Sequence, residues 1–589
     1  MKKMKKSRLA VVLLSSVMTL ATIPFPAFAE TSNYTYTYDY WNELQSSPNT
    51  YEVTESFTGM EFGGIAFNNP QGMFVHNDKI YICDTNNDRI VVLNHSDKEF
   101  TLDTIIDSFD ANGLDVTIRH TINDQTSDGA EKEADAEGET KVDESQAEGE
   151  EGTEKVEEDT TGDGEEDAEA VDGTTAEGTE DADGAAEGTV EADTPSKTGD
   201  NSKVGTAFFR PYDIFVDDDD TMYVCDYGHC RIVKISKDLK LLQIVDDPKD
   251  NTLDNEKTKF IFKPKKMVVD DTGRLFVLAE NINKGFMAFD PSGEFTGYIG
   301  ANKVTFSAWD RFWKRFATEK QKEKMVNFVP TTYNNIALST DGFFMATTDE
   351  YETSDLRDDE KQPIRKLNSQ GSDILIRNGY NQPMGDIRVG TAAGYTGPSK
   401  IIDATTLDNN TYFLIDRNRG RIFAYDSQGN LLYGFGGPGN KEGYFQSPSA
   451  IDVIGRDLLI LDYSANTLTV MTLTEYGKLI NSAIETYQVG DYDGSAQYWE
   501  EVLKYNGNYT LAYIGIGRSL LRKDQYKEAM DYFKQAYDYD NYSKAFKLYR
   551  KEWIEDNIGW IFALVVVIIL VPAVISKVKS LIREVEDIE

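Results

Sequence analysis

The chain has 589 residues, with 60 Lys and Arg against 101 Asp and Glu, and its formal net charge is -41 at pH 7. This charge excludes the basic surface that nucleic-acid binding requires. The 6 Trp, 32 Tyr and 30 Phe supply large apolar side chains for several folded domains.

A secretory signal is predicted at residues 1–29. The cationic start MKKMKKSR is followed by the apolar run LAVVLLSSVMTLAT and by the small-residue pattern Ala27-Phe28-Ala29. This order is typical of an exported protein, with cleavage between Ala29 and Glu30. A retained membrane anchor is the alternative, and the prolines at positions 24 and 26 oppose it because they break the helix. We therefore expect the chain after the cleavage site to lie outside the cytoplasm.

One sequence motif occurs six times between residues 51 and 477. Its clearest copy, Phe209 to Ser236, places short strands of β-branched and aromatic residues on either side of an acidic turn. The other copies begin at Gln71, Phe262, Thr331, Gly397 and Ser447. Such repeats predict an all-β six-bladed propeller, because neighbouring blades bury the sheet faces that one blade leaves exposed. After an N-terminal segment at 30–50, the alternating stretch Tyr51–Phe57 is expected to complete the last blade and close the ring.

An acidic residue recurs at one position of this motif, as Asp84, Asp226, Asp416 and Asp462. In copies one, two and five it is followed five residues later by Arg-Ile. This sequence pattern resembles the NHL repeat, and the resemblance is weaker in copies three, four and six. Because the Asp recurs from blade to blade, we expect it to bind the backbone of a turn and not to act in catalysis.

Two insertions interrupt the propeller. Residues 126–200 contain about 29 acidic residues against about 4 Lys and almost no large apolar residue, which predicts a disordered loop. It is either a solubilising loop or a polyanionic brush. Residues 307–325 predict a helix with one aromatic and one basic face. Its candidate partner-binding residues are Trp309, Phe312, Trp313, Arg315 and Phe316. That helix binds a membrane surface or a partner, or else it packs against the propeller.

After the propeller, residues 478–555 change to a helical pattern with a period of 34 residues. Tyr492 and Tyr526, and Trp499 and Phe533, are two pairs at this spacing. The pattern resembles tetratricopeptide (TPR) repeats, and we expect two helical hairpins followed by a cap helix at Ser543 to Glu555. TPR arrays bind peptides or proteins, as the resemblance implies; the alternative is a spacer between propeller and membrane.

A single transmembrane helix is predicted at residues 558–575, which carry no charge. Lys577, Lys579 and Arg583 follow the segment, whereas Glu552 and Glu555 precede it. Positive residues favour the cytoplasmic side, so the tail at 576–589 is expected inside the cell. Together with the signal, this predicts a single-pass protein of the cell membrane, of Gram-positive type, with its bulk outside.

The sequence identifies no catalytic residue, no cofactor and no metal ligand. Its 4 His lack zinc-binding spacing. Of the 3 Cys, Cys225 and Cys230 flank a turn, and they either pair or remain buried free thiols.

These features favour a membrane-anchored extracellular binding or scaffold protein. It would present the propeller and the TPR groove to a protein or glycan partner, for example a membrane transport complex. The alternative is a metal-dependent lactonase or other hydrolase. The propeller shape resembles that of gluconolactonases, which implies Ca or Zn in the central channel, held by carboxylates and Asn from different blades. The resemblance does not identify those ligands in this sequence.

Overall fold

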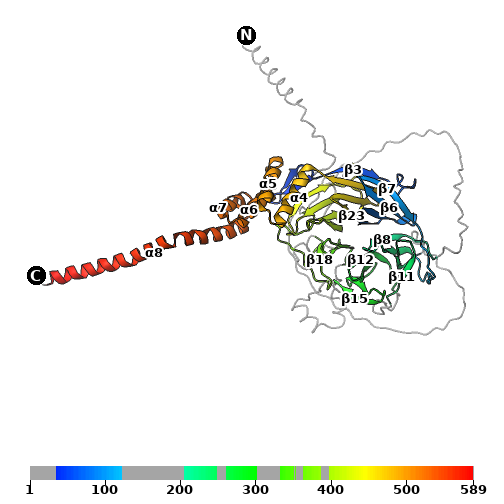
Figure 1. Cartoon of the computed structure of the whole chain (residues 1–589), viewed down its shortest axis with the longest axis horizontal. Helices are drawn as coiled ribbons and strands as arrows, with labels where there is room; N and C mark the ends of the chain where they lie inside the picture. The colour runs from blue at the N-terminus through cyan, green and yellow to red at the C-terminus, as the bar shows by residue number, and fades with distance from the viewer. Residues whose placement is uncertain are drawn as a thin grey trace, which may run out of the picture. The chain divides into compact units, whose positions relative to one another are not determined.

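The computed structural model describes residues 35–122, 205–248, 260–300, 332–349, 352, 362–386 and 397–587. In this part of the chain, six antiparallel sheets are followed by five helices (Figure 1). The expected six-bladed propeller, helical region and long apolar C-terminal helix are therefore confirmed.

The sheets form the blades in chain order. Blade one contains β4 (Gly72–His76), β5 (Lys79–Asp84), β6 (Arg89–Ser96) and β7 (Glu99–Ile106). Blade two contains β8 (Pro211–Val216), β9 (Met222–Asp226), β10 (Arg231–Ile235) and β11 (Leu241–Val245). Blade three contains β12 (Pro264–Val269), β13 (Leu275–Ala279), β14 (Phe286–Phe289) and β15 (Phe295–Ile299).

The remaining blades follow the same plan. In its described part, blade four contains β16 (Asn335–Leu338), β17 (Phe344–Thr347) and β18 (Ile364–Leu367). Blade five contains β19 (Ile401–Thr406), β20 (Tyr412–Asp416), β21 (Arg421–Tyr425) and β22 (Leu431–Gly436). Blade six contains β23 (Pro448–Ile454), β24 (Asp457–Asp462) and β25 (Thr467–Leu473).

The N-terminal strands complete the last two blades. β3 (Tyr51–Phe57) pairs with β25, so the predicted closure of the ring is confirmed. β1 (Thr35–Tyr38) and β2 (Leu44–Ser47) form a hairpin that extends blade five through β22. Tyr36 lies opposite Gly434, and a Cβ there would come within 2.9 Å of the tyrosine ring. Glycine at 434 therefore lets the hairpin join the blade.

The recurring Asp residues have the structural role expected of them. Asp84 accepts a hydrogen bond from the backbone N–H of Asn68 at 2.7 Å, and Asp226 accepts one from Phe209 at 2.8 Å. In blade one, the guanidinium Nε of Arg89, the arginine five residues after the Asp, donates to the same carboxylate at 2.6 Å. Both carboxylates are fully buried. Each Asp thus joins a strand end to the turn before its blade.

Blade five departs from this pattern. Asp416 still accepts backbone hydrogen bonds, from Lys400 at 3.1 Å and Asn418 at 3.0 Å. Arg421, however, pairs with Asp386 and lies over the ring of Tyr36. The added N-terminal hairpin supplies that ring, and so the arginine has a different set of partners here.

Five helices follow blade six: α4 (Glu475–Gln488), α5 (Tyr492–Tyr505), α6 (Thr510–Arg522), α7 (Tyr526–Gln535) and α8 (Tyr539–Glu586). The side chains of Thr474 and Asp491 cap α4 and α5 by accepting hydrogen bonds from backbone N–H groups. The predicted cap helix and the predicted spanning segment are one continuous helix, α8. The helix continues through Asp556 and Asn557, which lie between these two predicted segments. Gly559 does not end it either, because its φ is not in the left-handed region.

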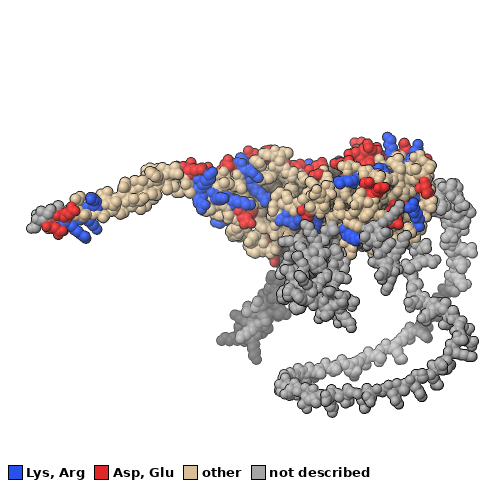
Figure 2. Space-filling model, turned by 90° about the horizontal axis from the view of Figure 1, so that it is seen from below, with Lys and Arg blue, Asp and Glu red and all other residues tan. Residues whose placement is uncertain are grey.

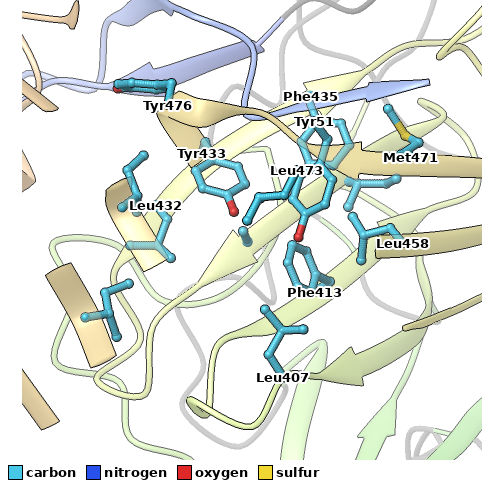
Figure 3. Packing of buried hydrophobic residues seen from close by; sticks show 14 of the residues in the cluster. Tyr51, Leu407, Phe413, Leu432, Tyr433, Phe435, Leu458, Met471, Leu473 and Tyr476 are labelled. Carbon is cyan, nitrogen blue, oxygen red and sulfur yellow. The ribbon is translucent and has the colours of Figure 1, made fainter. Parts of the chain in front are cut away.

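The helices pack on the propeller through a shared core. One cluster of buried apolar residues contains blade residues such as Phe413 and Phe435 and helix residues such as Ile480 and Trp499. Figure 3 shows part of this cluster, with Tyr476 of α4 beside residues of the last two blades. Polar contacts add to it: Gln488 donates to the carbonyl of Asn409 at 2.7 Å.

α8 exposes its apolar residues. The helix is long and apolar enough to cross a membrane, and its most apolar part has a mean hydropathy of 3.0 with none of it buried. Figure 2 shows a stretch of α8 without charged side chains, with Lys and Arg gathered beyond it near the C-terminal end. Elsewhere, Cys83, Cys225 and Cys230 are buried free thiols, so Cys225 and Cys230 are not paired.

Candidate functional site

The site residues predicted from the sequence lie outside the described residues. This applies to the signal cleavage site at Ala29 and Glu30 and to the acidic insertion at 126–200. It also applies to the aromatic and basic helix at 307–325, with Trp309, Phe312, Trp313, Arg315 and Phe316. In the described part of the chain, one cluster of buried polar groups lies in the propeller channel.

The first strand of every blade lines this channel, which encloses a cavity of about 60 Å³. Strand pairing places six residues at the same register, each three positions before the last paired residue of its strand. These six residues are Met73, Asp213, Lys266, Asn335, Asp403 and Ile451, and all of them line the cavity. Blade six, the fifth to contribute a polar residue, adds Asp452, one residue further along β23. Buried charges from different blades therefore converge on the axis.

Asp213 and Lys266 form a buried ion pair between blades two and three. The ammonium Nζ of Lys266 lies 3.2 Å from Oδ1 of Asp213. The other oxygen of Asp213 accepts a hydrogen bond from the backbone N–H of Met267 at 3.1 Å. Burial lowers the pKa of Lys266, but the Asp213 and Asp403 carboxylates outweigh this and raise it above its ordinary value. Lys266 therefore carries the positive charge of the channel.

Asp403 connects three blades. Its Oδ1 accepts hydrogen bonds from the side-chain amide of Asn335 and from its neighbour's backbone N–H at Ala404. Its Oδ2 accepts a hydrogen bond from the backbone N–H of Ile451 at 2.9 Å. Burial raises the pKa of Asp403 to about 6, although the charge of Lys266 acts in the opposite direction.

Asp452 connects blade six to blades five and one. Oδ1 accepts hydrogen bonds from the hydroxyl of Thr405 at 3.1 Å and from the backbone N–H of Val453 at 2.8 Å. Oδ2 accepts one from the backbone N–H of Val75 at 2.8 Å. Burial raises the pKa of Asp452 to about 7, against the lowering effect of these hydrogen bonds.

The three carboxylates share one geometry. Asp213, Asp403 and Asp452 each accept a hydrogen bond from a backbone N–H in the first strand of the next blade. A carboxylate in this position satisfies an N–H that the channel would otherwise leave without a partner. The cluster therefore joins neighbouring blades, and its cavity is far below the roughly 300 Å³ of a typical small-molecule site.

The residues present do not fit a channel metal. Among the described residues, no three His, Cys, Asp or Glu side chains are grouped so that they could hold a metal ion. The ammonium of Lys266 also lies among the carboxylates that a cation would need. The described channel residues therefore do not suit the metal that the hydrolase alternative requires.

The sequence predicted none of these channel residues, because the residue type at this position changes from blade to blade and only Asp occurs twice. Aligning the copies by the last residue of each first strand would have shown one column with Met, Asp, Lys, Asn, Asp and Ile. Charged residues in a column that should be buried are the signal that could have identified the cluster.

No protein-family model matches the chain, and no curated protein matches it. Solved structures that are similar to it include virginiamycin B lyase from Staphylococcus aureus, at 9% identity and TM-score 0.32, covering 72% of this chain and 100% of that chain. A putative 6-phosphogluconolactonase from Bacteroides uniformis has 10% identity and TM-score 0.31, covering 75% and 88%. The gluconolactonase XC5397 from Xanthomonas campestris has 12% identity and TM-score 0.21, covering 44% and 83%. At these values the comparisons assign no activity.

Proposed function

We propose that this protein is a membrane-anchored binding protein that presents a propeller outside the cytoplasm to a protein or glycan partner. The partner class includes membrane transport complexes. In this proposal the propeller is of NHL type, the helices α4 to α7 are TPR hairpins, and the first 29 residues direct export of a Gram-positive cell-surface protein.

The observation that carries the proposal is the shared core of propeller and helices. Tyr476 and Trp499 are buried in the same apolar cluster as Phe413 and Phe435. An ion pair between Arg456 and Glu485, at 2.7 Å, joins blade six to α4 at the edge of this core. A separate flexible tether would need no such core. This packing favours a role for helices α4 to α7 as a rigid connection between the propeller and the start of α8.

The channel supports binding over catalysis. Its buried carboxylates connect blades, and its cavity of about 60 Å³ is too small for a typical substrate. The available surfaces are therefore the outer faces of the blades and helices. α8 supports the membrane attachment, because its exposed apolar residues need a nonpolar surrounding.

Protease treatment of intact bacterial cells that express the full chain tests this proposal. We expect external protease to remove the propeller and to leave a membrane-bound fragment that contains α8. N-terminal sequencing of the mature protein should begin at Glu30. A chain that ends before Ile558 serves as the matched control and should leave the membrane fraction.

Two results would contradict the proposal. One is protection of the propeller in intact cells together with digestion after lysis. The other is an unchanged membrane fraction for the chain that ends before Ile558. Chemical crosslinking on intact cells then identifies the partner, with the shortened chain as its control.

A further inference from the structure

A second cavity lies where the N-terminal hairpin, the ring-closing strand and the helices meet. Its volume is about 400 Å³, within the range of small-molecule binding sites. Residues of β1, β2, β3, α4 and α5 and of the loops beside them line it. It is distinct from the propeller channel, whose lining residues are all different.

Most of the lining consists of uncharged hydrogen-bonding groups. Hydroxyls come from Thr35, Ser47 and Thr474, and a carboxamide comes from Asn49. The hydroxyl of Thr35 donates to the side-chain oxygen of Asn49 at 3.3 Å. The hydroxyl of Thr474 donates to the backbone carbonyl of Asn49 at 2.7 Å. These contacts hold the polar groups in place before any ligand binds, which lowers the entropy cost of binding.

Two tyrosines provide an aromatic wall. The rings of Tyr476 and Tyr505 have centroids 5.9 Å apart. Tyr476 is buried and accepts a hydrogen bond from Ser47 at 3.2 Å, so its position is fixed. Tyr505 is 56% exposed and is available to a ligand at the cavity. An exposed tyrosine offers an apolar face together with a hydroxyl group.

The charges at the cavity are negative. Glu52 and Glu475 line it, and no Lys, Arg or His does. Lys478 contacts Glu475 at 2.6 Å but is not part of the lining. The N-terminus of α4 is already capped, because Thr474 accepts a hydrogen bond from the N–H of Gly477 at 3.2 Å. Anionic ligands such as phosphates are therefore disfavoured at this cavity.

We propose that this cavity binds a neutral saccharide. The C–H face of a sugar ring would pack on Tyr505, while its hydroxyls would donate to Glu52 and Glu475 and bond to the hydroxyl and amide groups of the wall. Carboxylates form strong hydrogen bonds with hydroxyl donors, and the wall also offers apolar surface, so it suits the two kinds of surface of a sugar ring. This proposal rests on the proposed function, of which it names the class of ligand.

Titration of the purified full chain in detergent tests the site, with binding measured by calorimetry. The probes are glucose, N-acetylglucosamine, maltose and cellobiose, with glucuronate and glucose 6-phosphate as anionic counterparts. We expect millimolar or tighter binding of at least one neutral probe. Tyr505→Ala should weaken it by about tenfold, which corresponds to the loss of one ring contact. Glu52→Gln should weaken it as well.

Two variants serve as matched controls. Tyr498→Ala removes another exposed tyrosine of α5, and Glu55→Gln changes another carboxylate of β3, which is partly buried; neither residue lines the cavity. Both should bind like the unchanged chain. The inference is overturned if no neutral probe binds, if the anionic probes bind more tightly, or if Tyr505→Ala and Glu52→Gln both bind normally. Protease accessibility on intact cells is measured separately, so failure of the cavity and failure of the surface location remain distinguishable.

Discussion

The hydroxyl of Tyr509 donates a hydrogen bond to the backbone carbonyl of Leu432 at 2.9 Å, which connects the start of α6 to β22 of blade five. Tyr509 is almost fully buried, and its ring also packs on Trp499. One side chain thus contacts both the helices and the propeller. The two parts should unfold together as a consequence.

Tyr509→Ala should separate the unfolding of the helices from that of the propeller. Loss of a buried aromatic side chain costs about 3–5 kcal/mol, and here the loss falls at the junction. Calorimetry of the full chain in detergent should show two transitions in place of one. Tyr539→Ala, at an exposed tyrosine of α8, is the control. A single, unshifted transition in Tyr509→Ala would contradict the shared core.

Asp213→Asn should destabilise the propeller by about 3–5 kcal/mol, because it leaves the buried ammonium of Lys266 without its paired charge. Urea unfolding measures this loss. Asp219→Asn changes an exposed turn carboxylate of the same blade and should have little effect. The double variant Asp213→Asn with Lys266→Met should recover part of the stability. If Asp213→Asn is as stable as the control, the ion pair does not hold the blades.

Asp403 and Asp452 should make the stability fall as pH rises from about 4 to about 7. Burial raises the pKa of Asp403 to about 6 and of Asp452 to about 7, above the value near 3.8 of an exposed Asp. A raised pKa means that the folded state binds the proton more tightly. Its contribution is therefore complete below about pH 4 and is lost as pH passes the folded-state values.

Asp452→Asn tests this pH dependence. The amide oxygen can still accept the hydrogen bonds, and it does not ionise. Relative to the unchanged chain, the variant should gain on the order of 2 kcal/mol in unfolding free energy between pH 5 and pH 8. Urea unfolding at the two pH values gives the difference. Equal slopes with pH for both proteins would show that Asp452 does not titrate in this range.

Gly517→Ala should destabilise the helical region although alanine favours helices. A Cβ at this position would lie 2.7 Å from the ring of Phe533, where α6 crosses α7. We expect a loss of about 1–3 kcal/mol from overpacking. Gly507→Ala is the matched control, since its nearest atom is 3.8 Å away. Thermal unfolding followed by circular dichroism measures both. A stabilised Gly517→Ala protein would mean that the helices do not cross this closely.

The sequence predicted the blades because their signals are local and repeat. The Asp at 84 and 226 recurs, and each carboxylate binds a turn as expected. The channel cluster could not be predicted in this way, because Asp213, Lys266 and Asn335 occupy one register with different chemistry. The second cavity depends on contacts such as that between Ser47 and Tyr476, which are far apart in the chain. No local pattern encodes such a contact.

The helix boundaries show the same limit. The sequence separated a cap helix from an apolar segment by composition, whereas α8 runs through both. Pro572 lies inside this helix, where it removes one backbone hydrogen bond without ending the helix. Composition predicts which residues are apolar, but continuity depends on the backbone of the residues between them.

The pairing of β3 with β25 also limits the order in which the propeller can fold. As the chain leaves the ribosome, Tyr51–Phe57 emerges early and has no partner until Thr467–Leu473 has followed. During that interval the first strand is an unprotected edge that can pair with another nascent chain. Closure of the ring is therefore a late step in folding. The yield of folded protein should depend on whether β3 is kept from pairing with other nascent chains until β25 has formed.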